Sequence, residues 1–158
     1  SKKSMDMRLQ VRGSILPITS VLLFQSQDND SSDSFSNLRL LVGTGSFVEV
    51  FEVCSGKKLL RSQVLYGSCL HGLRLCPPTS HGPVRFICFG QRRCKLLELD
   101  ISKSTVKTVF DFPVFIDYIL DVKFINSVNN GSENTSLVII SFAQGSVQIW
   151  DIARGQCQ

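Results

Sequence analysis

The sequence predicts an all-β fold, and two observations carry this prediction. The 158 residues include 15 Val, 11 Ile and 11 Phe, against only 2 Ala and 4 Glu. Such β-branched and aromatic side chains fit a pleated surface, whereas helices are usually built from Ala, Leu, Glu, Lys and Gln. Short runs of strand-favouring residues also recur at close, even spacing between Gly, Ser, Asn and Pro turns. The composition excludes a helical bundle and argues against an α/β enzyme fold.

Eleven strand-like runs follow one another along the chain. They form three units, of which the first two have four runs and the third has three. The expected strands are Ile18–Phe24, Leu38–Val42, Phe47–Val53 and Lys58–Leu65, then Leu70–Leu75, Val84–Phe89, Lys95–Ile101 and Thr105–Phe110, then Tyr118–Ile125, Leu137–Phe142 and Val147–Ile152.

The longest connection in each unit falls between its first and second run. These connections are Gln25–Asn37, Cys76–Pro83 and Asn126–Ser136, and two of them are rich in Ser, Asn and Asp. Sequences of that kind bury little apolar surface. If the units are alike in structure, all three connections are expected at one edge of the molecule.

The third run of every unit ends in a large apolar residue followed by an acid. The pairs are Phe51-Glu52, Leu99-Asp100 and Trp150-Asp151, separated by 48 and 51 residues. The acid is expected to cap the strand where the next turn begins. In the last copy, Val147 and Ile149 alternate with Trp150 and Ile152, which predicts a strand buried on both faces.

These repeats resemble the WD40 family, with the WD dipeptide itself at Trp150-Asp151. The first two copies are degenerate, and the Gly-His dipeptide usual in the family is absent. The spacing slightly exceeds the period of about 40–45 residues of WD40 blades. The resemblance implies a β-propeller segment of about two and three-quarter four-stranded blades. The alternative is another all-β fold, such as a sandwich, with a fortuitous Trp-Asp.

The expected organisation is an N-terminal extension (1–15), a first blade (16–66), a second blade (67–112) and an incomplete third blade (113–158). A closed propeller needs about four to eight blades. Left open, such an arrangement exposes unpaired strand edges. We therefore expect a segment whose partner is the remainder of a larger propeller protein.

Four further motifs occur in order along the chain. They are Leu40-Leu41-Val42-Gly43-Thr44-Gly45, Val48-Glu49-Val50-Phe51, Leu70-His71-Gly72-Leu73-Arg74 and Phe86-Ile87-Cys88-Phe89-Gly90. Together they resemble a family of WD-repeat proteins that partner the tRNA wobble-position 2′-O-ribose methyltransferase. The resemblance implies a non-catalytic subunit that binds the methyltransferase subunit and helps to present the tRNA anticodon loop, with the methyl donor and catalytic residues on the partner.

Positive charge is concentrated in the middle of the sequence. Between Lys57 and Lys107 there are ten Lys and Arg but only two acids, Glu98 and Asp100. This section could attract an anionic partner such as RNA, or it could be a solvated surface whose charge is balanced elsewhere. We favour the second interpretation because the charges are spread over several predicted strands.

The residues offer no evident metal or catalytic site. The six cysteines contain no C-x-x-C pair, and the spacing from Cys69 to His81 is irregular for zinc, so we expect reduced thiols, no metal and no cofactor. Catalysis requires a nucleophile, a base and an orienting group that converge. The histidines are His71, expected to bond within a blade, and His81 in a Pro/Gly/Ser loop. The chain is therefore not expected to be an enzyme.

The best local candidates for contact with RNA or a protein partner are Arg92, Arg93 and Lys95, at the turn between two expected strands. Arginine suits phosphate because its planar fork makes paired charge-assisted hydrogen bonds. The alternative is an ordinary polar hairpin turn, which we favour. The N-terminal apolar run is short and interrupted by Pro17, so a cytoplasmic location is expected.

The function expected from these features is that of a non-catalytic WD40 scaffold. In the first reading it is an accessory subunit for 2′-O-methylation of the tRNA wobble nucleotide. In the second it is a protein-interaction adaptor in ubiquitin-ligase targeting or vesicle traffic, without RNA. A propeller suits either task, so the fold alone does not decide between them.

Overall fold

The computed structural model describes residues 16–26, 37–77, 82–128 and 134–158, and within them the chain is entirely β. The strands are β1 (Ile18–Gln25), β2 (Leu38–Thr44), β3 (Phe47–Glu52), β4 (Lys58–Gln63), β5 (Gly72–Leu75), β6 (Val84–Gly90), β7 (Arg93–Asp100), β8 (Thr105–Asp111), β9 (Ile119–Val128), β10 (Asn134–Phe142), β11 (Val147–Asp151) and β12 (Gln156–Cys157). All eleven expected strands are present, with boundaries shifted by a few residues.

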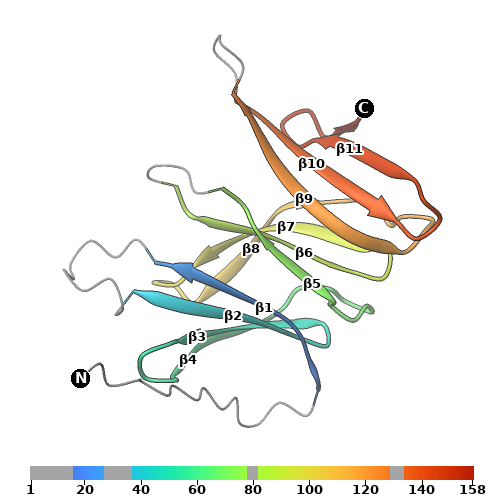
Figure 1. Ribbon diagram of the computed structural model, residues 1–158. Helices are drawn as coiled ribbons and strands as arrows, with labels where there is room; N and C mark the ends of the chain where they lie inside the picture. The colour runs from blue at the N-terminus through green and yellow to red at the C-terminus, as the bar shows by residue number, and fades with distance from the viewer. Residues whose placement is uncertain (1–15, 27–36, 78–81, 129–133) are drawn as a thin grey trace, which may run out of the picture.

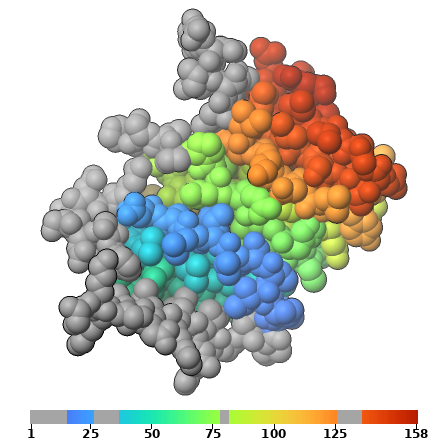
Figure 2. Space-filling view, in the orientation of Figure 1, coloured from blue at the N-terminus to red at the C-terminus, as the bar shows by residue number. Residues whose placement is uncertain are grey.

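The strands form three antiparallel sheets of four, and each sheet takes four consecutive strands in chain order. The sheets β1–β4, β5–β8 and β9–β12 lie one after another along the molecule (Figure 1). The space-filling view shows the same succession, from blue through green to orange and red (Figure 2). Successive four-stranded meanders packed face to face are the blades of a β-propeller segment, as the sequence predicts.

The third blade differs from the expectation in two ways. It was expected to have three strands, but β12, of two residues, pairs with Trp150 and Asp151 and supplies a fourth. The prediction that its third strand is buried on both faces is wrong. Val147 is 61% exposed and Ile149 is 37% exposed, because no sheet of the described residues packs against that face of β11.

Two hydrophobic clusters hold the blades together. The first lies between blades 1 and 2 and the second between blades 2 and 3, since alternate residues of each strand point to opposite faces. In blade 2, Phe86 and Cys88 belong to the first cluster, whereas Ile87 and Phe89 belong to the second. β6 is therefore buried on both faces from Phe86 to Phe89, which explains the continuous apolar run there.

The first strands of the blades run parallel to one another. Thr19 donates a hydrogen bond to the Leu70 carbonyl and Ser20 accepts one from the Leu73 amide, so β1 and β5 advance together. β5 and β9 also run in the same direction, because His71 bonds the Ile119 carbonyl and Arg74 bonds Asp121. Because β1, β5 and β9 end at one edge, the three long connections leave the blades there, as expected. Residues 27–36, 78–81 and 129–133 within those connections lie outside the described part.

Candidate functional site

The predicted contact residues lie on the tight turn between β6 and β7. Gln91 has a positive φ of 54°, which lets the chain reverse between the paired residues Gly90 and Arg93. Arg92 is exposed and Arg93 is half-buried. Lys95 differs from them, because its ammonium pairs with Asp111 at 3.0 Å and its side chain is only 15% exposed.

The structure neutralises most of the basic middle section. Six of its ten Lys and Arg side chains form ion pairs with acids of this chain: Lys58 and Arg61 with Glu49, Arg74 with Asp121, Arg85 with Glu98, Lys95 with Asp111, and Lys103 with Asp100. Arg92 and Arg93 form no ion pair with the described residues. Lys57 and Lys107 form none within the described ranges either, so two of the four basic residues without such an ion pair are neighbours on this turn.

The repeated apolar–acid pairs occupy equivalent places, at the ends of β3, β7 and β11. The side chains of Leu99 and Trp150 face the preceding blade. Leu99 lies in the cluster between blades 1 and 2, and Trp150 packs against that between blades 2 and 3. The Trp150 ring lies 5.5 Å from Phe112 and 6.1 Å from Phe115, centroid to centroid. These positions therefore hold blades together.

The acids of the pairs bond the turns that follow. Asp100 accepts hydrogen bonds from the Ser102 hydroxyl (2.6 Å) and the Lys103 amide (3.1 Å), and these bonds lower the pKa of its carboxyl to about 2. Asp151 accepts from the Arg154 amide at 3.1 Å, and Glu52 accepts from the Ser55 hydroxyl at 2.5 Å. The predicted capping role is confirmed.

The motifs that carry the methyltransferase-partner resemblance are close-packed in blade 2 and against it. A Cβ atom at Gly72 would lie 2.0 Å from the Phe89 ring, and a Cβ at Gly90 would lie 1.9 Å from the Cys69 carbonyl oxygen. A Cβ at Gly43 would lie 2.4 Å from the Leu70 side chain. Glycine is therefore needed at all three positions by close packing.

His71 links blades 2 and 3 through hydrogen bonds. Its Nε2 donates to the Ile119 carbonyl at 3.0 Å, and its Nδ1 accepts from the Gln91 amide at 3.3 Å. The tautomer with its proton on Nε2 satisfies both bonds. The ring also meets Phe89 edge-on at 5.1 Å. The bonds of His71 therefore reach beyond its own blade; His81, the other histidine, lies outside the described residues.

The loop between β8 and β9 (residues 112–118), which was not among the predicted contact residues, adjoins the Arg92 turn. The Phe115 amide donates to the Arg92 carbonyl at 2.9 Å, and the Ile119 amide donates to the Gln91 carbonyl at 2.7 Å. Phe115 is buried, whereas Ile116 is 95% exposed. The alternation of apolar residues after Pro113 was the available signal, but only the fold shows which of them face outward.

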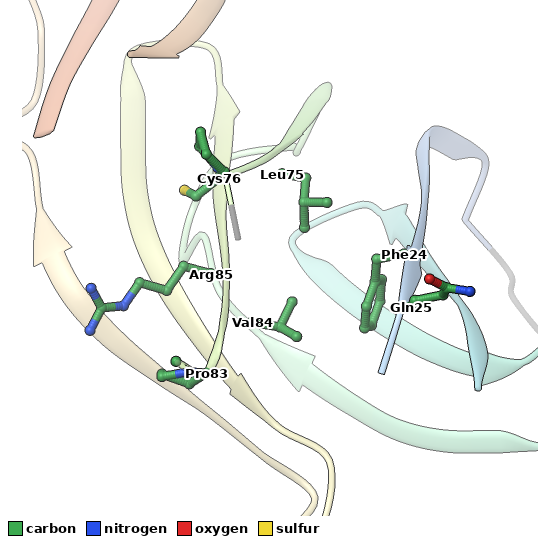
Figure 3. Close-up of a pocket in the computed structure, with 9 residues that line it drawn as sticks. Phe24, Gln25, Leu75, Cys76, Pro83, Val84 and Arg85 are labelled. Carbon is green, nitrogen blue, oxygen red and sulfur yellow. The ribbon is translucent and has the colours of Figure 1, made fainter. Parts of the chain in front are cut away.

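A pocket of about 370 Å³ lies between blades 1 and 2 at the opposite edge (Figure 3). Phe24, Leu75 and Val84 line it, and the Arg85 side chain points away from Phe24 (Figure 3). Its thiol, Cys76, is a poor nucleophile, because burial raises the pKa of the Cys76 side chain to about 12. The pocket therefore has apolar walls without an activated group.

Within the described ranges, no cluster of three or more His, Cys, Asp or Glu side chains could hold a metal ion. The same part of the chain contains no helix able to cross a bilayer.

A comparison with protein-family models found no match, and a comparison with curated proteins found none either. Among solved structures, the chain is similar to the crystal structure described as BBS1N in complex with ARL6DN, soaked with lead. The TM-score is 0.44 at 15% sequence identity, over 90% of this chain and 54% of that one. The chain thus spans about half the length of that structure.

Proposed function

We propose that the chain is a non-catalytic WD40 scaffold, the accessory subunit of an enzyme that methylates the 2′-oxygen of the tRNA wobble nucleotide. The observation that carries the proposal is the close packing of Gly43, Gly72 and Gly90 in and against blade 2, where Gly72 and Gly90 pack within the blade and Gly43 packs on its Leu70 from blade 1. The motifs that resemble the methyltransferase-partner family are thus parts of one packed unit, rather than short matches scattered over the chain.

The chemistry of the described residues supports a binding role. The histidine among them is engaged through both ring nitrogens, and burial raises the pKa of Cys76 and Cys88 to about 12. The pocket between blades 1 and 2 brings no base or metal-binding group beside a nucleophile. In this proposal, the methyl donor and the catalytic residues belong to the partner subunit, and the chain is cytoplasmic.

The test is ribose methylation at the wobble position of cellular tRNAs after depletion of the protein, measured by mass spectrometry of tRNA nucleosides. We expect a selective loss at that position, with other tRNA methylations intact. Unchanged wobble methylation would refute the proposal and favour a WD40 adaptor for protein partners. Ribonuclease treatment of the purified complex then shows whether RNA holds its components together.

A further inference from the structure

The loop between β8 and β9 displays apolar side chains on a rigid frame. Val114, Ile116 and Tyr118 are 53%, 95% and 59% exposed, whereas the intervening Phe115 is 6% exposed and packs beside Trp150 and Phe142. The loop therefore alternates between anchors that point into the core and apolar side chains left in water. Exposed apolar side chains gathered in one place mark interaction surfaces more often than isolated ones do.

Hydrogen bonds fix this loop to both neighbouring blades. The Phe115 amide bonds the Arg92 carbonyl in blade 2. Asp117 accepts from the Gln144 amide in blade 3 at 2.7 Å, and the Ala143 amide donates to the Tyr118 carbonyl at 2.9 Å. A partner that binds here meets a preorganised surface, so little conformational entropy is lost on binding.

The charge beside the apolar residues is positive. Arg92 and Arg93 lie on the neighbouring turn between β6 and β7 and form no ion pair with the described residues. The acid in the loop is Asp117, whose two carboxylate oxygens accept the Tyr118 and Gln144 amides, so the two arginines leave a net positive charge here. Aromatic residues and arginine around an apolar centre are the composition of binding hot spots.

We propose that Val114, Ile116, Tyr118, Arg92 and Arg93, together the Ile116 surface, dock a protein segment that carries apolar anchors flanked by acidic residues. The inference extends the proposed function by naming where a protein partner binds. RNA is the less suitable occupant, because two aliphatic side chains gain nothing from phosphates and Tyr118 is the only ring for base stacking. A segment with apolar anchors and flanking acids complements both the exposed apolar side chains and the two arginines of this surface.

The experiment is selection of random twelve-residue peptides displayed on phage, with the full chain as bait and counter-selection against the variant Ile116→Asp. Ile116 is almost wholly exposed, so this variant is expected to fold. Its urea unfolding, followed by Trp150 fluorescence, verifies this. Val21→Asp is the matched control, because Val21 is 60% exposed on β1 in another blade.

We expect enriched peptides that combine Asp or Glu with aromatic or aliphatic residues. Their affinity should fall about tenfold or more with Ile116→Asp, since loss of a hot-spot contact has that effect. Affinity should also fall with Arg92→Glu/Arg93→Glu, in a salt-dependent manner, and be unchanged in Val21→Asp. Enriched peptides without acids, or equal binding to Ile116→Asp, would overturn the proposal.

Two further arms separate this inference from the proposed function. If the selected peptides compete with the methyltransferase subunit for the chain, both proposals are supported. If the peptides bind as expected but the methyltransferase subunit does not bind the chain, the surface stands and the proposed function fails. Loss of tRNA binding in Ile116→Asp, without peptide selection at this surface, would assign it to RNA and overturn the protein-docking inference.

Discussion

Replacing Gly72 with alanine should destabilise the packing between blades 2 and 3 through a clash with the side chain of Phe89. The added Cβ would lie 2.0–2.6 Å from three atoms of the Phe89 ring, whereas an ordinary contact is 3.4–4 Å. Phe89 is 1% exposed and meets His71 edge-on, so its ring has no free space to enter. Overpacking of this kind costs roughly 1–3 kcal/mol, against a gain of about 0.4–1 kcal/mol from the smaller entropy of the unfolded chain.

The assay is urea unfolding followed by the fluorescence of Trp150, the single tryptophan. Its ring packs against Phe112 and Phe115 between blades 2 and 3, so it reports on the part of the molecule under strain. With a denaturant dependence of about 2 kcal/mol per molar urea, a net loss of about 1–2 kcal/mol lowers the midpoint by about 0.5–1 M.

A second substitution separates the clash from other effects of alanine. Phe89→Leu removes the ring atoms that the new Cβ meets, so Gly72→Ala should cost much less in that background, with a coupling of about 1 kcal/mol or more. Gly67→Ala is the control: its φ of +71° makes alanine strained, but nothing lies within 4 Å of the added Cβ. Its cost should not change with Phe89→Leu. An unchanged midpoint in Gly72→Ala, or additivity with Phe89→Leu, would refute the reasoning.

Three further predictions concern charge and thiols. Burial raises the pKa of Cys76 and Cys88 to about 12 and that of Cys94 well above its usual value, so an aromatic disulfide reagent at pH 8 should label only the exposed Cys54, Cys69 and Cys157 rapidly. Rapid labelling of six thiols in the native protein would contradict this. A double-mutant cycle of Arg74→Ala and Asp121→Ala, read by urea unfolding, should give a coupling of about 0.2–1 kcal/mol, because both side chains are about two-fifths exposed; a coupling of several kcal/mol would contradict it. Because the pKa of Asp100 is lowered from 3.8 to about 2 in the folded chain, its contribution to stability is present above pH 4 and is lost as the pH falls towards 2. Asp100→Asn should therefore remove part of the loss of stability measured between pH 4 and 2, and an unaltered pH dependence would exclude this role.

The sequence by itself determined the strands, their grouping in fours and the equivalence of Leu99 and Trp150. This was possible because strand propensity, alternation and turn residues are local properties. Even the capping role of Asp100 followed from its position before a turn. The two residues of β12 were missed, because Gln156 and Cys157 carry no alternating apolar pattern and become a strand only by pairing with Trp150 and Asp151.

Only the tertiary structure decided which faces and charges remain available. Alternation places Val147 on a face of its strand, but the burial of that face depends on another sheet lying against it. Arg92 and Lys95 are equally basic in the sequence, yet Asp111 neutralises only Lys95. An apolar residue such as Ile116, among other apolar residues, would be expected in the core. In the structure it is exposed, because its neighbour Phe115 is buried and the hydrogen bonds of the loop hold the backbone in that orientation. Exposure and pairing depend on residues distant in sequence, so local patterns determine the strands and their packing determines the surface.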